Sequence, residues 1–315
     1  MKITTINQIP FGQLDSEYDL MICASGYESR AIYVAEALLS RSANKVNGLV
    51  LAFDEHKEIL ARPQNDKFFE KFRFESKICI GASTENAEVI ISEKLHQLKR
   101  SKPSKILVDI SSMTRAWYGA VVKCLTQLTE LGNLEVHFTY TPAEYNPPSE
   151  NYPPNRVVCP VRGFSGNTFP DVPTALVIGL GYDPDRALGL KEYLDPQLTF
   201  LFIPDPSTDA RYLEKVKNVN SFLLGITSSE QKAAYPVLDM VSTFKLLEST
   251  CNGLKRNWRV VLCSFGPKTF GLCCFLVASI HRDLSIWRVG ADHHEKPINH
   301  KPGGDPLVLR TSWRG

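Results

Sequence analysis

Short apolar runs alternate with amphipathic segments along the whole chain. In the first half, five apolar runs predict β-strands, and the segments between them repeat apolar residues at the spacing of half-buried helices. The segment 115–131 is the clearest, because its apolar residues recur from Ala116 to Leu128 at i, i+4 and i+5. The predicted strands are 19–23, 46–53, 77–80, 105–110 and 134–140, and the predicted helices are 29–40, 65–72, 83–100 and 115–131.

The second half repeats this order of elements. Strands are predicted at 174–179, 198–203, 259–264 and 284–289, and helices at 185–194, 209–219, 235–252 and 268–281. Strands that alternate with helices predict a parallel sheet covered by helices on both faces. The sequence therefore predicts an α/β protein with two tandem Rossmann-like units, related by an internal duplication and a pseudo-two-fold axis.

Two short motifs recur in the two halves at nearly one offset, which supports this duplication. Each half has an apolar strand that runs into a Gly-Tyr turn and an arginine, and later a strand that runs into a polar turn ending in a cation. The offset is 155 residues at the glycine (181 minus 26) and 153 at the cation (268 minus 115). The first motif comprises Gly26, Tyr27 and Arg30 in one half and Gly181, Tyr182 and Arg186 in the other.

A proline-rich stretch separates the halves. Eight prolines fall from Pro142 to Pro173, interleaved with Asn, Ser and Gly, so the stretch cannot form a long helix or a central strand. We therefore predict a first unit at 1–141, a connector at 142–173, a second unit at 174–295 and an irregular basic tail at 296–315.

Composition limits the classes of function. A chain of 315 residues with 43% hydrophobic and 22% charged residues is typical of a globular protein of two domains. A net charge of +2 is too small to indicate non-specific DNA binding. The sequence has neither a run of ~20 apolar residues nor an apolar leader, so we expect a cytoplasmic protein that does not bind membranes. The eight cysteines and seven histidines lack metal-ligand spacing, so we expect no metal and no other cofactor.

The polar turns that end in a cation have the chemistry of an anion-binding site. In open α/β sheets, ligands lie beyond the carboxyl ends of the strands, where a helix N-terminus offers unpaired N–H groups and a partial positive charge. Hydroxyl groups add donors, and arginine suits phosphate. The candidate residues are Ser111, Ser112, Thr114 and Arg115 in the first half and Gly266, Lys268 and Thr269 in the second.

Each candidate also has a structural interpretation. Serine and threonine before a helix are ordinary N-caps. The tyrosines of the Gly-Tyr turns either stack on a base or pack against the protein. Arg30 and Arg186 either bind an anion or form salt bridges with Glu28 and Asp185.

The segment from Val108 to Arg115 resembles the hallmark turn of CARF domains, in which an apolar strand ends in Asp (here Asp109) and leads through hydroxyl and small residues to Thr and a cation. CARF and related SAVED domains are Rossmann-like sensors of cyclic oligonucleotides in prokaryotic defence, and SAVED domains fuse two such units. The resemblance implies ligand contacts from Ser111, Ser112, Thr114, Arg115, Ser264, Gly266, Lys268 and Thr269. Two departures are Ser112-Met113 in place of two glycines and Leu262-Cys263 in place of the second aspartate.

Three functions follow from these patterns. The first is a binding module that senses a nucleotide across the pseudo-two-fold cleft and acts through a separate effector protein. The second is an enzyme that cleaves such a nucleotide, either through the ligand's own 2′-hydroxyl or with Asp109 or Asp54 as a base. The third is a protein-interaction subunit that docks a partner on Tyr140, Tyr145 and Tyr152 of the proline-rich region.

Overall fold

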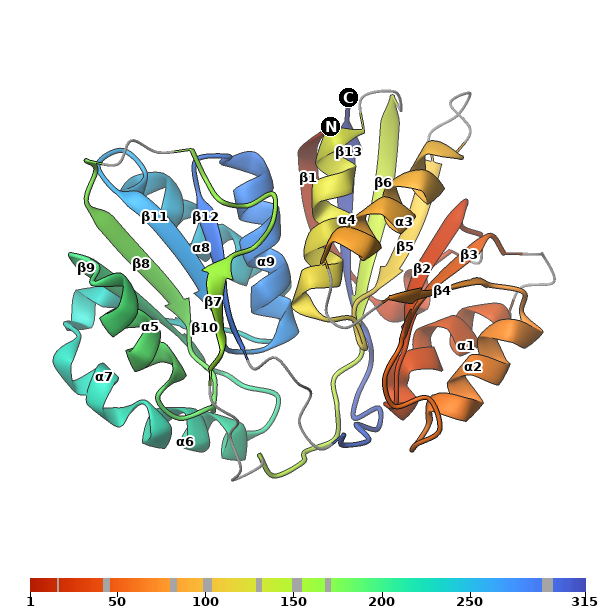
Figure 1. Ribbon diagram of the computed structural model, residues 1–315, viewed down its shortest axis with the longest axis horizontal. Helices are drawn as coiled ribbons and strands as arrows, with labels where there is room; N and C mark the ends of the chain where they lie inside the picture. Colours follow the sequence, from red (N-terminus) through yellow and green to blue (C-terminus); the bar gives the residue numbers. More distant parts are fainter. Residues whose placement is uncertain are drawn as a thin grey trace. The chain divides into compact units, whose positions relative to one another are not determined.

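The computed structural model describes residues 1–15, 17–41, 46–79, 84–98, 104–128, 132–148, 155–167, 171–290 and 297–315 (Figure 1). The chain divides into two compact units. The first unit consists of Met1–Asn146 together with Lys296–Gly315, and the second consists of Pro147–Glu295. The fold is α/β, as the sequence predicts, and parallel strands dominate both sheets.

The first unit contains a seven-stranded sheet in the order β1-β13-β6-β5-β2-β3-β4. Its strands are β1 (Lys2–Ile9), β2 (Leu20–Ser25), β3 (Gly48–Phe53), β4 (Glu75–Cys79), β5 (Ser104–Asp109), β6 (Asn133–Tyr140) and β13 (Leu307–Arg314). Its described helices are η1 (Phe11–Gln13), η2 (Ser29–Ile32), α1 (Tyr33–Leu39), α2 (Arg62–Lys71), α3 (Thr84–His96) and α4 (Arg115–Gln127). Strand β13 is antiparallel to both β6 and β1, whereas the other neighbours are parallel.

The second unit contains a six-stranded sheet in the order β10-β9-β8-β11-β12-β7. Its strands are β7 (Val157–Pro160), β8 (Thr174–Gly179), β9 (Leu198–Pro204), β10 (Lys232–Tyr235), β11 (Arg259–Ser264) and β12 (Ser285–Gly290). Its described helices are α5 (Arg186–Leu194), α6 (Ala210–Val219), α7 (Ser221–Ile226), η3 (Ser229–Gln231), α8 (Met240–Leu254) and α9 (Lys268–Ile280). Only β7 is antiparallel to its neighbour among these strands.

The two sheets share one topology. In each unit, five parallel strands stand in the order 3-2-1-4-5, counted along that unit's sequence, and an antiparallel strand lies beside the fifth. This is the strand order of a Rossmann-like unit. The first strand (β2 or β8) and the fourth (β5 or β11) are direct neighbours. The direction of winding reverses between them, and open α/β sheets bind ligands at the carboxyl ends of such a pair.

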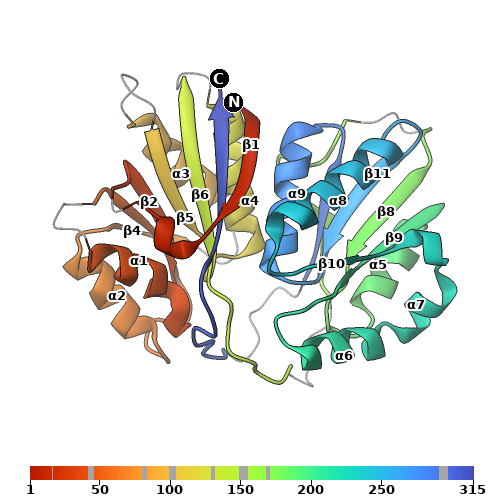
Figure 2. The same cartoon turned by 180° about the vertical axis from the view of Figure 1, so that it is seen from behind.

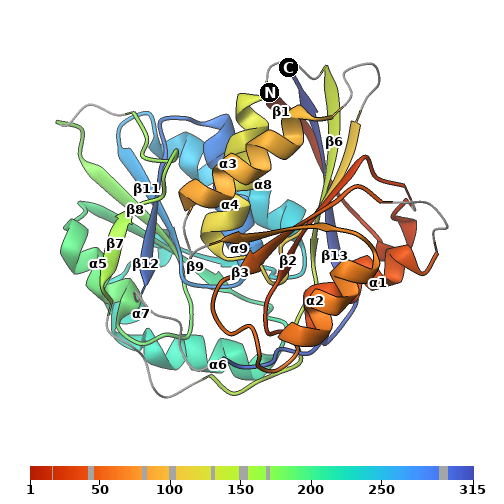
Figure 3. The same ribbon diagram turned by 45° about the vertical axis from the view of Figure 1, so that its right-hand side comes forward.

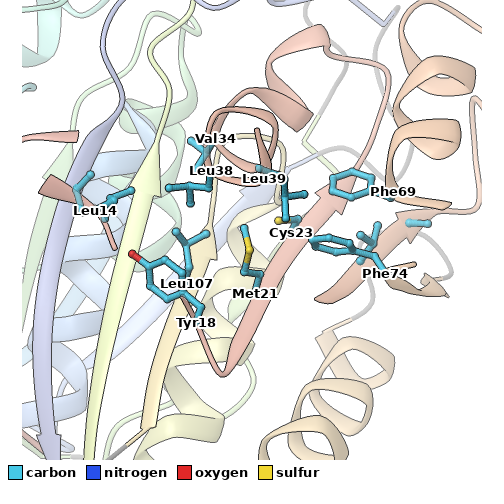
Figure 4. Packing of buried hydrophobic residues seen from close by; sticks show 14 residues of the cluster. Leu14, Tyr18, Met21, Cys23, Val34, Leu38, Leu39, Phe69, Phe74 and Leu107 are labelled. Atoms are coloured by element: carbon cyan, nitrogen blue, oxygen red, sulfur yellow. The ribbon is translucent and has the colours of Figure 1, made fainter. Parts of the chain in front are cut away.

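Helices cover both faces of each sheet. In the first unit, α1 and α2 lie on one face and α3 and α4 on the other (Figure 1 and Figure 2). Helices α3 and α4 pack side by side, as Figure 3 shows. The core beneath α1 and α2 joins Met21 and Cys23 of β2 to Leu38 of α1 and Phe69 of α2 (Figure 4). Each such fully buried side chain contributes ~1.5–3 kcal/mol. In the second unit, the matching cluster lies between β8, β11 and helices α5, α6 and α7.

The prediction of an irregular tail at 296–315 is wrong. Residues 307–314 form strand β13, which pairs with β6 on one side and with β1 on the other. Val308, Leu309, Thr311 and Trp313 are buried in the first unit. The sequence did not reveal this strand, because its partners lie far away in the chain and it carries two arginines beside its apolar residues.

Three further strands were missed. Strand β1 exposes most of its residues, so it lacks an apolar run. Strand β7 lies within the predicted connector, 142–173, as an edge strand, where proline is tolerated. Strand β10 has four residues, Lys232–Tyr235, and ends at the first residue of the predicted helix 235–252. That helix in fact begins at Met240 as α8. The ends of predicted segments 77–80, 83–100 and 115–131 lie partly outside the described residues.

Candidate functional site

The turn after β2 in the first unit is held by buried hydrogen bonds. The Gly26 carbonyl accepts a hydrogen bond from the Asn65 amide at 2.8 Å. Tyr27 makes an edge contact with His56, with ring centroids 5.8 Å apart. Asn65 lies in α2 and is almost completely buried. The Gly-Tyr turn after β2 is therefore held in place by a hydrogen bond from helix α2.

Arg30 is part of a buried ion pair. Only 4% of Arg30 is exposed, and its Nε donates to Glu28 Oε2 at 2.8 Å while Nη1 donates to the Thr141 carbonyl at 3.0 Å. Burial by itself lowers the pKa of Arg30, but the Glu28 carboxylate and Tyr140 raise it by more than burial lowers it. The net pKa therefore lies above the usual value of arginine, and the guanidinium stays charged. Of the two interpretations of Arg30, the geometry matches the salt bridge.

The helix that follows this turn is capped by a distant segment. The Ser29 N–H donates to Asn299 Oδ1 at 2.7 Å, and the Arg30 N–H donates to the His300 carbonyl at 3.4 Å. These are first-turn N–H groups of η2, the kind that bind phosphate in other α/β proteins. In the first unit the chain's own residues occupy them.

The turn after β5 begins with hydrogen bonds between its own residues. Asp109 Oδ1 accepts from the Ser111 N–H at 3.0 Å and from Ser111 Oγ at 2.5 Å. Ser111 Oγ in turn accepts from the Thr141 N–H at 2.8 Å. Asp109 is 2% exposed and Ser111 is fully buried. These two residues therefore shape the turn by bonding each other and Thr141, the residue that follows β6.

The remaining residues of this turn lead into α4. Ser112 Oγ donates to Glu28 Oε2 at 3.3 Å, which links the turn after β5 to the turn after β2. Thr114 is the N-cap of α4, and its side chain accepts from the Trp117 N–H at 3.2 Å. Arg115 is the first residue of α4 and is exposed to solvent. Thr114 is thus a cap, while Arg115 presents a cation at a helix N-terminus.

The turn after β8 in the second unit follows the same design. The Gly181 carbonyl accepts from the buried Asn220 amide at 2.9 Å, as Gly26 does from Asn65. Arg186 pairs with Asp183 at 2.7 Å, so the salt-bridge interpretation holds with a partner other than the expected Asp185. The Tyr182 ring stacks on Tyr212 of α6, with centroids 5.7 Å apart and an interplanar angle of 18°.

The turns after β8 and β11 pack backbone to backbone. A Cβ at Gly181 would lie 2.1 Å from the Phe265 carbonyl oxygen, and a Cβ at Gly266 would lie 2.6 Å from the Leu180 carbonyl oxygen. The Gly266 N–H also donates to the Gly179 carbonyl at 3.2 Å. Glycine is required at both positions by this close approach. The tips of the first and fourth strands are therefore in direct contact.

The N-terminus of α9 differs from that of α4. Its N-cap, Pro267, makes no side-chain capping hydrogen bond, whereas Thr114 caps α4, and neither helix has an acidic residue in its first turn. Lys268 is its first residue. Ser264 Oγ and Thr269 Oγ1 are buried and have no hydrogen-bond partner among the residues that the structure describes. Two hydroxyl groups and a cation thus stand at an uncapped helix N-terminus.

The chain matches no protein-family model and no curated protein in the comparisons made with it. Among solved structures, it is similar to the cytoplasmic domain of a prokaryotic cation chloride cotransporter, over 88% of this chain and 96% of that chain. The two are 11% identical, with a TM-score of 0.27. A likeness at this level supports no inference about function.

The described residues were also compared with the requirements of a metal site and of a membrane-spanning helix. Within the described ranges, no group of three or more His, Cys, Asp or Glu side chains could hold a metal ion. In the same part of the chain, no helix is long and apolar enough to cross a membrane. The eight cysteines are free thiols, and burial raises the pKa of Cys124 and of Cys251 to about 12, which makes both unreactive. Tyr152, one residue of the suggested docking surface, lies outside the described residues.

Sequence reasoning missed four residues that shape these turns: Asn65, Asn220, Asn299 and Tyr212. The first two carry a signal in the repeat, because they are 155 residues apart (220 minus 65), the offset that relates Gly26 to Gly181. Asn299 and Tyr212 carry none, since their contacts depend on the folded chain.

Proposed function

We propose that this protein binds a phosphate-bearing nucleotide and that the second unit holds the phosphate at the N-terminus of α9. The observation that carries the proposal is the pair of buried hydroxyl groups, Ser264 Oγ and Thr269 Oγ1, without a hydrogen-bond partner among the described residues. A buried hydroxyl left unpaired costs ~1–3 kcal/mol. A ligand oxygen that accepts from these groups recovers that cost on binding.

The charges at this turn favour an anion. A helix N-terminus carries a partial positive charge, which normally disfavours a cation in the first turn. Lys268 is the first residue of α9 and adds its own positive charge at this N-terminus. A bound phosphate offsets both positive charges and supplies several acceptor oxygens for hydroxyl and backbone N–H groups.

The resemblance of residues 108–115 to CARF and SAVED domains supports a cyclic oligonucleotide as the ligand. On this proposal the protein is the sensing component of a prokaryotic defence system, and a separate protein acts as its effector.

The test is binding of a panel of linear and cyclic oligonucleotides, with mass spectrometry of the retained and free fractions, followed by titration calorimetry with the retained species. Lys268→Gln and Thr269→Val each remove one bond to the phosphate, so we expect affinity to fall about 10- to 100-fold for each. The matched control is Lys245→Gln, an exposed lysine of α8 in the same unit, which we expect to bind like the wild type.

Thr269→Val separates ligand binding from stability. The Thr269 hydroxyl has no protein partner among the described residues, so replacing it with a methyl group removes no intramolecular hydrogen bond. We therefore expect unchanged or higher thermal stability of the unliganded variant together with weaker binding. Retained wild-type affinity in both Lys268→Gln and Thr269→Val refutes the proposal, as does the retention of no species by the wild type.

A further inference from the structure

We infer that the carboxylate of Asp205 accepts hydrogen bonds from the ribose hydroxyls of the ligand, so that the second unit selects a ribonucleotide. This inference rests on the proposed phosphate site and adds the sugar that the site recognises. Asp205 directly follows β9, and 41% of its side chain is exposed. Its carboxylate therefore stands at the carboxyl end of a strand, where open α/β sheets bind ligands.

Asp205 lies two strands away from the phosphate site. Phe202 of β9, Gly179 of β8 and Ser264 of β11 stand opposite one another in the sheet, so the carboxyl ends of these three strands are level. Neighbouring strands are ~4.8 Å apart, which places β9 about 10 Å from β11. Hydrogen bonds of ~3 Å at each end cover more than half of this distance. The sugar of a 5′-nucleotide bridges the remainder, because it joins the phosphate to the ribose hydroxyls.

Tyr235 connects Asp205 to the turn before α9. The Tyr235 carbonyl accepts a hydrogen bond from the Asp205 N–H at 3.0 Å, and its hydroxyl oxygen lies 3.0 Å from the position of a Cβ at Gly266. Tyr235 is fully buried and packs on Phe270 of α9, with ring centroids 4.8 Å apart. The backbone of Asp205 is therefore fixed relative to the phosphate site, and binding costs little additional ordering there.

The negative charge of Asp205 limits which group of the ligand it can contact. A carboxylate accepts hydrogen bonds and repels a phosphate, so beside a phosphate site it favours neutral donors of the same ligand. The two neighbouring hydroxyls of ribose are such donors. Lys217 Nζ lies 3.5 Å from Asp205 Oδ2, but both side chains are largely exposed, and an exposed ion pair of this kind contributes little to stability. A ribose can therefore replace this contact at small cost.

The repeat places an aspartate at the same point of the first unit. Asp54 directly follows β3, which is the second strand of that unit, as Asp205 directly follows β9. The two aspartates are 151 residues apart (205 minus 54), close to the offset of the other repeated motifs. The position is thus part of the duplicated pattern, and the inference concerns Asp205 because the proposed phosphate site lies in the second unit.

The test compares adenosine 5′-monophosphate with 2′,3′-dideoxyadenosine 5′-monophosphate, which lacks both ribose hydroxyls, using ligand-observed NMR titrations. We expect the wild type to bind the ribonucleotide about 5- to 30-fold more tightly. Asp205→Ala should abolish this preference without weakening the dideoxynucleotide, a result that a merely structural role of Asp205 would not produce. Lys268→Gln should weaken both nucleotides. The matched control is Glu192→Ala, which removes an exposed carboxylate of α5 in the same unit and should keep the preference.

The outcomes separate this inference from the proposed function. Equal binding of the two nucleotides to the wild type overturns the ribose contact, while the phosphate site stands if Lys268→Gln weakens both. An Asp205→Ala variant that still prefers the ribonucleotide, or that binds both nucleotides more weakly by the same factor, also overturns the ribose contact. No binding of either nucleotide to the wild type overturns both the ribose contact and the phosphate site. A preference that Glu192→Ala also removes overturns the assignment to Asp205.

Discussion

Replacing Asn220 with alanine should destabilise the second unit, and replacing Asn65 should destabilise the first unit by a similar amount. Each amide donates to a buried glycine carbonyl, Gly181 or Gly26, and to a second carbonyl. The second carbonyl keeps a backbone donor after either substitution, because Val216 also accepts from the Asn220 N–H and Glu28 from the Ala31 N–H. The main loss is therefore at the glycine carbonyl.

The expected loss of stability follows from the number of hydrogen bonds that each substitution removes. Two hydrogen bonds contribute ~0.5–1.5 kcal/mol each, and a buried carbonyl that loses its donor adds to that loss, so we expect ~2–3 kcal/mol per variant. Because 1.4 kcal/mol corresponds to a factor of ten, slow amide exchange in the affected unit should accelerate roughly 30- to 150-fold. Hydrogen exchange with mass spectrometry reads each unit separately, which a single unfolding curve of a two-unit chain cannot do.

The control for Asn220 is Asn218→Ala, an exposed asparagine on the same helix. We expect it to change exchange in the second unit less than threefold, because surface substitutions usually fall within about 0.5 kcal/mol. The reasoning is refuted if Asn220→Ala accelerates exchange no more than Asn218→Ala does. It is also refuted if Asn220→Ala acts equally on both units.

Two further predictions concern the first unit. Burial lowers the pKa of His137, although Glu135 opposes this, so the folded protein binds the proton less readily than the unfolded chain does. The free energy of unfolding should therefore fall as the pH drops below about 6.5. Chemical denaturation between pH 7.5 and 5.5 should show a weaker pH dependence in His137→Gln than in the wild type. Trp313→Ala should cost ~3–5 kcal/mol in the first unit, because Trp313 is 1% exposed. A loss below about 0.5 kcal/mol, which is typical of a surface residue, would contradict the integral role of β13.

The central parts of both sheets could be predicted from the sequence. Strands β8 and β11 have the predicted bounds, because four or more consecutive apolar residues mark a strand buried on both faces. The edge strands could not be found in this way. Strand β10 has one buried residue of four, and β1 exposes five of its eight residues, so neither has the apolar signal.

The sequence predicted where the candidate residues lie better than it predicted what each of them contacts. The repeated motifs lie at the carboxyl ends of the first and fourth strands, as expected. Sequence alone left open whether Arg30 binds an anion or Glu28, because that choice depends on Thr141 and Tyr140, which are distant in the chain. Nor could it reveal that Thr269 lacks a hydrogen-bond partner among the described residues, since this depends on how the surrounding elements pack.

The place of strand β13 in the sequence also determines the order in which the two units can complete their folding. The second unit lies in the sequence between β6 and β13, which are neighbours in the sheet of the first unit. A ribosome synthesising ~5–20 residues per second therefore completes the whole second unit before β13 emerges. During that interval β6 and β1 have exposed edges, while the second unit can already fold. The first unit begins synthesis first and finishes folding last.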